Sequence, residues 1–155
     1  MKKPTLGQAA SLTAMKLTVS HTFVIVDDQD KALSFYRDML GLQLRIDAPL
    51  GAVRWLTVGP ESQPELEIGL VPPEMGHSPE DARALSELLA KGALGNLIFR
   101  TDDCDATFER IQAAGAEVLQ EPIDQPYGVR DCAFRDPAGN HIRFAQSLTG
   151  AATKT

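Results

Sequence analysis

Two short stretches decide the fold: Val26-Asp27-Asp28-Gln29-Asp30 and Thr101-Asp102-Asp103-Cys104-Asp105, which share a pattern at an offset of 75 residues (102 − 27 = 75). Each follows a short apolar run and begins a segment with helical spacing of apolar residues, which ends at Gly41 in the first copy and at Gly115 in the second. A repeat of this size predicts one pseudo-symmetric protein of two similar modules. We expect a ligand pocket between the modules, where pockets commonly form.

Composition excludes several classes of protein. The 155 residues carry a net charge of −6 and are 43% hydrophobic. No run of Lys or Arg marks a nucleic-acid surface, and no apolar stretch is long enough to span a bilayer, so we expect neither kind of partner. Two cysteines, Cys104 and Cys132, form neither a disulfide framework nor a zinc-binding spacing. We expect a cytoplasmic protein with reduced thiols.

The first copy predicts a strand, a helix and three further strands. Residues 19–26 are β-branched and aromatic, as strands are. Asp28 or Asp30 caps the following helix, whose apolar positions fall on one side until Gly41. The strands after it are expected at Leu42–Asp47, Val53–Val58 and Glu65–Leu70.

The second copy predicts the same order. A strand at Leu94–Thr101 precedes a helix that begins near Cys104 and stops at Gly115. Strands are expected at Ala116–Leu119, Arg130–Phe134 and His141–Ala145. Between the copies, Ser78-Pro79-Glu80-Asp81 is a helix start, with a Ser cap, Pro in the first turn and acidic residues after it. This connecting helix is either a lid or dimer contact, or a helix packed on the body.

We therefore predict an α+β protein of two tandem βαβββ modules, whose mixed sheets curl into a cup with the helices outside. The expected segments are a flexible leader at 1–15, modules at 16–72 and 94–147, a connector at 73–93 and a flexible tail at 148–155. Side chains alternate between the two faces of a strand, which assigns each residue to the helix side or to the cup.

Two motifs resemble those of the vicinal oxygen chelate superfamily, which includes glyoxalase I, extradiol dioxygenases, fosfomycin resistance enzymes and bleomycin resistance proteins. One is His21-Thr22-Phe23-Val24-Ile25-Val26-Asp27 with the Phe35-Tyr36 and Leu40-Gly41-Leu42 that follow it. The other is Phe134-Arg135-Asp136-Pro137-Ala138-Gly139-Asn140-His141-Ile142. The resemblance covers roughly residues 17–146. It implies the fold more strongly than the function, because this fold hosts many chemistries.

The resemblance also implies four cup positions that hold a metal in the enzymes of this superfamily. In this sequence those positions are His21, Glu67, Asn96 and Arg143. An arginine has no lone pair to give to a metal, so we expect no metal or other cofactor and instead a Glu67–Arg143 ion pair. The alternative is a divalent ion such as Zn, Ni, Mn or Fe, held by His21 and Glu67 with His141 as a third ligand.

Two functions follow as hypotheses. The first resembles bleomycin resistance proteins: an antibiotic-resistance type protein that sequesters an apolar or aromatic small molecule in a metal-free cup. The second is an enzyme, a glyoxalase-like lyase or isomerase more than a dioxygenase, in which His21 and Glu67 transfer protons. The resemblance further implies a homodimer in which modules of two chains share each cup. The expected ligand-binding residues are Phe23, Ile25, Trp55, Asn96, Ile98, Arg100, Tyr127, His141 and Arg143.

Three of these ligand-binding assignments have a plainer alternative. Trp55 either stacks on a planar ligand or anchors the core or an interface. Tyr127 lies in a Pro-bounded loop, 122–128, which either closes over the pocket or is an ordinary turn. Arg100 either binds a carboxylate or phenolate or is a surface charge at the end of a strand.

Overall fold

The computed structural model describes residues 13–149, apart from the side chain of Asn96. Most of the expected leader and tail therefore lie outside the described residues. Residues 13–20 are extended and exposed, and lead into the first strand. Among the described residues, no helix has both the length and the apolar character needed to cross a membrane.

The first module has the predicted order of elements. Its sheet has the strand order β1-β4-β3-β2, with β1 parallel to β4 and the other neighbours antiparallel. The predicted helix contains two parts, an α-helix and a π-helix. The elements are β1 (His21–Ile25), α2 (Gln29–Leu33), η1 (Ser34–Met39), β2 (Gln43–Leu50), β3 (Val53–Gly59) and β4 (Glu67–Val71).

The second module repeats the topology, with the order β5-β8-β7-β6 and β5 parallel to β8. Its second strand, β6, runs through Pro122 to Asp124, farther than the four residues expected, and its register with β7 shifts twice. Proline is tolerated there because β6 is an edge strand. The elements are β5 (Asn96–Arg100), α4 (Cys104–Ala113), β6 (Glu117–Asp124), β7 (Val129–Arg135) and β8 (His141–Ser147).

The connecting helix α3 (Pro79–Ala90) packs on the body of the protein. The Ser78 side chain caps it by accepting a hydrogen bond from the Asp81 backbone N–H. Leu89 is only 2% exposed and belongs to the main core. Gly139 of the second module lies directly against the Leu89 carbonyl, where a Cβ could not fit. These contacts favour the packed-helix alternative over a lid.

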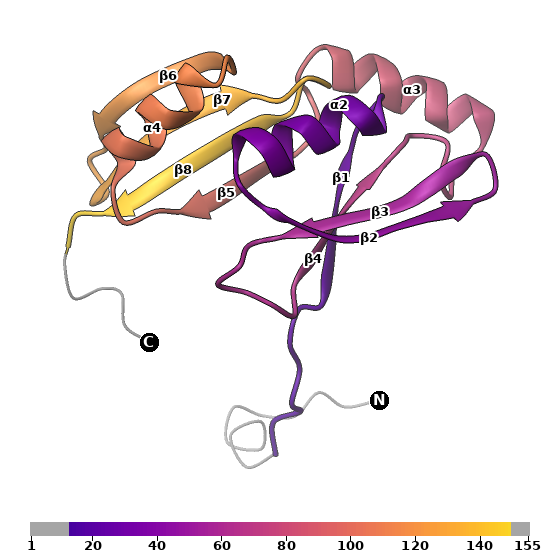
Figure 1. The fold of residues 1–155 in the computed structure, drawn as a ribbon, viewed down its shortest axis with the longest axis horizontal. Coiled ribbons are helices and arrows are strands. Elements are labelled where there is room, and N and C mark those ends of the chain that lie inside the picture. The colour runs from indigo at the N-terminus through magenta and orange to yellow at the C-terminus, as the bar shows by residue number, and fades with distance from the viewer. Residues whose placement is uncertain (1–12, 150–155) are drawn as a thin grey trace, which may run out of the picture.

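Figure 1 shows the helices along one side of both sheets, while the opposite face of each sheet is open. The residues that face the helices form one continuous core across the two modules, including Leu56, Ile68, Phe134 and Ile142. Alternation along each strand then places the intervening residues on the open faces. The two sheets are separate and do not close into a single barrel.

The π-helix η1 contributes to the junction between the modules. Its i→i+5 bond from the Leu40 N–H to the Phe35 carbonyl is 3.0 Å long, and it leaves Phe35 and Tyr36 both buried. The Tyr36 hydroxyl donates to Asp136 Oδ2 at 2.7 Å, and the Asn140 amide of the second module donates to the Ile25 carbonyl at 2.9 Å. We call these contacts the clasp between the modules.

Candidate functional site

The open face of the first module carries a histidine–glutamate pair. The β1–β4 register sets His21 beside Glu67, with 3.7 Å between His21 Nε2 and Glu67 Oε1. The buried Thr57 hydroxyl donates to the same carboxylate oxygen at 2.8 Å and fixes its orientation. The other ring nitrogen of His21 lies 2.9 Å from the Ser20 hydroxyl. The arrangement suits a proton acceptor whose carboxylate partner is held in place.

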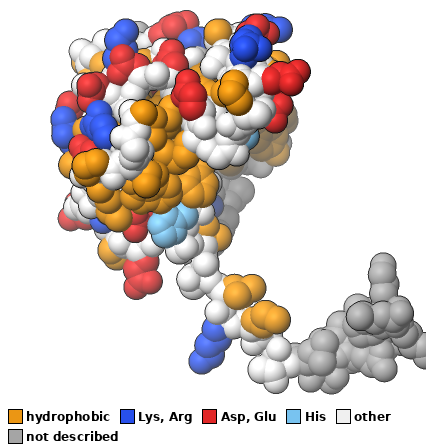
Figure 2. All heavy atoms as spheres, turned by 90° about the vertical axis from the view of Figure 1, so that its right-hand side faces the viewer, with side chains coloured by type: hydrophobic (Ala, Val, Ile, Leu, Met, Phe, Trp, Pro, Cys, Tyr) orange, Lys and Arg blue, Asp and Glu red, His pale blue; other side chains and the backbone are white. Residues whose placement is uncertain are grey.

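An aromatic wall stands next to this pair. Phe23 is 54% exposed, and its ring centroid lies 6.0 Å from that of the half-buried Trp55. Gly69 makes room for the Phe23 ring, because a Cβ at that position would come within 2.7 Å of it. Figure 2 shows hydrophobic side chains gathered on this side of the molecule, above the stretch that leads into β1. We call this surface, with His21 and Glu67, the first face.

The open face of the second module is polar. Asp131 on β7 is almost fully buried, with Oδ1 accepting from the Gln120 amide at 2.8 Å and from the Gln125 amide at 3.0 Å. Arg143 Nη1 lies 3.3 Å from Asp131 Oδ2 and donates to the Gln120 side-chain oxygen at 2.9 Å. Burial acts to raise the pKa of Asp131, but the two amide hydrogen bonds and the charge of Arg143 outweigh it, so the net shift of that pKa is downward.

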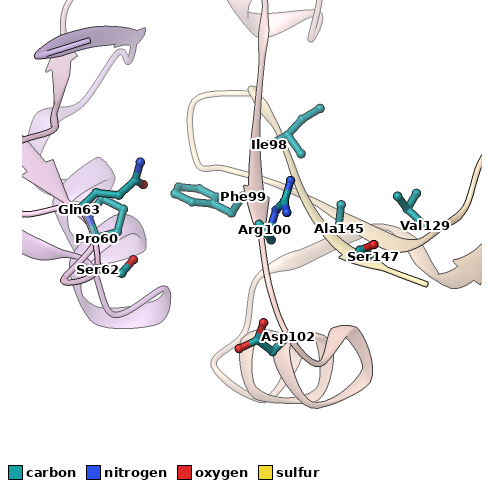
Figure 3. Close-up of a pocket in the computed structure, with 10 residues that line it drawn as sticks. All are labelled: Pro60, Ser62, Gln63, Ile98, Phe99, Arg100, Asp102, Val129, Ala145 and Ser147. Atoms are coloured by element: carbon teal, nitrogen blue, oxygen red, sulfur yellow. The ribbon is translucent and has the colours of Figure 1, made fainter. Parts of the chain in front are cut away.

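Ile98 and Arg100 lie on the same open face, along the free edge strand β5. Ile98 is 62% exposed and Arg100 is exposed, and no ion pair to Arg100 is present among the described residues. A hollow of about 680 Å³ lies at this edge, and the β3–β4 loop of the first module approaches it (Figure 3). It is lined by Pro60, Gln63, Ile98, Arg100, Val129 and Ala145, among others. We call this surface, with Asp131 and Arg143, the second face.

Two residues predicted to bind ligand, His141 and Tyr127, lie away from both faces. The His141 ring nitrogen lies close to Gly92 at the end of the connector, because His141 is the first residue of β8. Tyr127 is 70% exposed in the tight β6–β7 turn. The expected closing loop does not form, because β6 includes its first residues. Ile25 is half-buried at the seam between the modules. The side chain of Asn96 lies outside the described part of the chain.

The expected Glu67–Arg143 ion pair is absent from the described residues of this chain. Arg143 instead pairs with Asp131 of its own module. We did not predict this pair from the sequence. The signal was available: Asp131 precedes Cys132 and Phe134 on the helix side, so alternation places it beside Arg143 on the open face. Thr57 could have been found in the same way, because it lies between Leu56 and Val58 of the core. Gln120 could not, because the register shift after Val118 turns it to the open face.

These residues do not fit a metal. Within residues 13–149 no group of three or more His, Cys, Asp and Glu side chains is gathered as a metal site would require. His141 does not join His21 and Glu67, since it lies against the connector. Of the second-module residues at the metal positions, Arg143 is a cation already engaged with a carboxylate. Among the described side chains, these positions therefore offer one histidine and one glutamate, which is fewer than the usual set of protein ligands.

Comparisons with known proteins agree with this architecture. Residues 18–144 match the model of the Glyoxalase/Bleomycin resistance protein/Dioxygenase superfamily. The crystal structure of UcmS2 is 36% identical, with a TM-score of 0.79 over 86% of this chain and 100% of that chain. TnmS3, an antibiotic binding protein from Streptomyces sp. CB03234, is 32% identical, with a TM-score of 0.69 over 87% of this chain and 99% of that one.

Enzymes of the same superfamily are also similar. A probable lactoylglutathione lyase from Synechocystis sp. (strain ATCC 27184 / PCC 6803 / Kazusa) is 30% identical over 82% of this chain and 93% of the lyase. The match to the family model spans both modules, from the stretch before β1 to the middle of β8. By its repeated βαβββ modules and this match, the chain belongs to the Glyoxalase/Bleomycin resistance protein/Dioxygenase superfamily.

Proposed function

We propose that this protein binds a planar, largely apolar small molecule without a metal and sequesters it. The observation that carries the proposal is Arg143, which is held in an ion pair with Asp131. The resemblance implies that the superfamily's enzymes place a metal ligand at this position. The aromatic wall of Phe23 and Trp55 supplies the surface on which a planar ligand stacks. The likeness to TnmS3, which is described as an antibiotic binding protein, supports a ligand of the antibiotic class.

The proposal includes a homodimer in which the first face of one copy covers the second face of the other. Each chain leaves both faces open, with Phe23 and Ile98 more than half exposed. Pockets that bind such ligands usually enclose most of the ligand's surface, which one open face cannot do. The exposed stretch before β1 adds Met15, Leu17 and Val19, each more than 70% exposed. A second copy is the partner that buries these surfaces.

The test of binding uses Trp55, the only tryptophan of the chain. Titration with panels of planar polycyclic compounds should quench or shift its fluorescence to saturation, with one ligand per cup. Trp55→Phe removes the signal but keeps an aromatic ring, so calorimetry on that variant should still detect binding, whereas Trp55→Ala should weaken it about tenfold or more. If Trp55→Ala bound these compounds as tightly as the wild-type protein does, the aromatic wall would not be part of the binding site.

The metal-free part of the proposal needs its own measurement. Protein incubated with Zn, Ni, Mn or Fe(II) and then desalted should retain far less than one ion per chain by elemental mass spectrometry. Stoichiometric retention that is lost in His21→Ala would contradict the proposal. It would move the assignment to a metalloenzyme.

A second function has one specific observation in its favour, the His21–Glu67 pair that Thr57 orients. In that case His21 accepts a proton next to a substrate carbonyl, and Glu67 stabilises the imidazolium. Turnover of the hemithioacetal of methylglyoxal and glutathione separates the two functions. A sequestering protein gives no turnover, while an enzyme loses orders of magnitude in His21→Ala.

A further inference from the structure

Two side chains of the same module, Asp131 and Gln120, fix the position of Arg143. Asp131 and Gln120 each contact Arg143, and the Gln120 amide also donates to Asp131, so the three side chains form a closed ring. Gln125 adds a further bond to the same carboxylate. Arginine side chains lose much rotational freedom when they are fixed, and a closed ring supplies that order before any ligand arrives.

The ring leaves most of the guanidinium available to a ligand. A guanidinium has five N–H donors. Both contacts of Arg143 run through Nη1, and neither Nε nor Nη2 has a hydrogen-bond partner among the described residues. Its neighbours along β8, Ile142 and Phe144, are buried in the core, so Arg143 lies on the open face, where its side chain is 34% exposed. These donors are ready to bind an acceptor above the second face.

The charged residues on this face indicate which kind of hydrogen-bond acceptor would bind to these donors. Its ionised residues are Arg143, Arg100, Asp131 and Asp102, two positive and two negative, and Asp131 is already engaged with Arg143. Arg100 lies two residues beyond Ile98, the residue paired with Arg143 across β5 and β8. A negative oxygen placed between the two arginines therefore meets two cations, one of which has open donors, and charge-assisted hydrogen bonds are the stronger kind.

We propose that Arg143, held by Asp131 and Gln120, is the specificity-determining residue of the site, and that it binds an acidic oxygen, a carboxylate or a phenolate, carried by the planar ligand. The inference rests on the proposed binding function and narrows it to planar aromatic acids. Arg143 supplies the positive charge at a position where related enzymes hold a metal. Asp131 acts through Arg143 as a positioning residue.

The experiment compares two probes of the same shape, 2-naphthoate and its neutral amide, 2-naphthamide, by isothermal titration calorimetry. The wild-type protein should bind the acid about tenfold more tightly than the amide. Arg143→Gln should abolish that preference while binding of the amide changes little. Arg143→Lys keeps the charge but loses the planar fork, so it should retain part of the preference. Arg83→Gln removes the same charge from the exposed side of α3 and should leave the preference intact.

The outcomes separate the two proposals. Equal affinity of the wild-type protein for the two probes, or a preference that survives in Arg143→Gln, overturns the role of Arg143 and leaves the binding function standing. Absence of binding of either probe, or of any planar compound, overturns the binding function as well. Asp131→Asn adds a further measurement. If Asp131 positions Arg143, this variant should prefer the acid over the amide by a smaller ratio of affinities, while its affinity for the amide stays the same. Circular dichroism of each variant checks that it is folded.

Discussion

Trp55 on β3 and Asp131 on β7 are equivalent positions of the repeat, 76 residues apart (131 − 55 = 76), yet they do opposite things. Trp55 forms half of an exposed aromatic wall, whereas Asp131 is a buried carboxylate that fixes an arginine. The pairing along the first strand of each module differs too: Glu67 lies beside His21 in the first module, whereas Arg143 lies beside Ile98 in the second. The two open faces have diverged while the strands beneath them kept their order.

Away from these faces the two modules are alike. Arg54 bridges Asp30 and Asp47 in the first module, joining the start of the helix to the β2–β3 hairpin. In the second module, Arg130 bridges Asp105 and Asp124 in the same way. The comparison shows that the residues joining helix to sheet are retained in both copies, while residues on the open faces are free to take on binding roles.

The junction between the modules breaks the symmetry most strongly, so it predicts the largest effect. Asp136 accepts hydrogen bonds from Tyr36, from the Asn140 side chain and from three backbone N–H groups, all in the buried interior. Its equivalent in the first module is Pro60 (136 − 76 = 60), which cannot play this part. Asp136→Ala leaves these donors without partners and should cost about 3–5 kcal/mol of the free energy of unfolding, measured in urea.

The control for this variant is Asp102→Ala, which removes the same charge from an exposed position in the loop before α4. It should change the free energy of unfolding by less than about 0.5 kcal/mol. A loss below about 1 kcal/mol in Asp136→Ala would mean that the clasp contributes little and that the shared apolar core alone joins the modules.

The second prediction concerns the acid sensitivity of the second face. Hydrogen bonds and Arg143 hold the pKa of Asp131 below its usual value despite burial. A carboxyl whose pKa is lower in the folded state adds stability above its unfolded pKa, near 4, and this contribution is lost as the pH falls through the folded pKa. Asp131→Asn should therefore destabilise the protein by about 2 kcal/mol at pH 7, with a smaller difference at pH 3, in urea unfolding at both values. A difference that grows toward pH 3 would contradict the assignment.

The third prediction tests the likeness of the modules. Arg54→Gln and Arg130→Gln each remove an arginine that bridges two aspartates, so they should lower the melting temperature by similar, small amounts. Exposed ion pairs contribute little, and equal environments should contribute equally. Differential scanning calorimetry of the two variants checks this. A large loss in one variant alone would show that the two triads are not equivalent.

The smallest effect is expected at the thiols. Cys104 and Cys132 are fully buried, and burial raises the pKa of Cys132 to about 12. A thiol in that state is a poor nucleophile, so native protein should not react with a disulfide reagent until it unfolds, when both thiols should react. Rapid labelling of native protein would show that the core of the second module opens. Cys104→Ser then tells which thiol reacts.

Much of the frame could be predicted from the sequence. The repeat at 75 residues, the caps at Asp28 and Ser78 and the glycines at 41 and 115 are local signals, and each reports on a few neighbouring residues. Alternation along the strands then assigned His21, Glu67 and Arg143 to the open faces, because side-chain direction in a strand follows from the backbone alone. The π-helix was not predicted, because the spacing of its apolar residues also fits an ordinary α-helix.

Only the tertiary structure decided the partners. Alternation put Asp131 on the same face as Arg143, but the sequence could not show that Asp131 was closer to Arg143 than Glu67 was. Nor could it show that His141 lies against Gly92, or that Tyr36 meets Asp136 a hundred residues away. Elements form from local preferences, whereas partners depend on the register and packing of segments far apart in the chain, which no local pattern records.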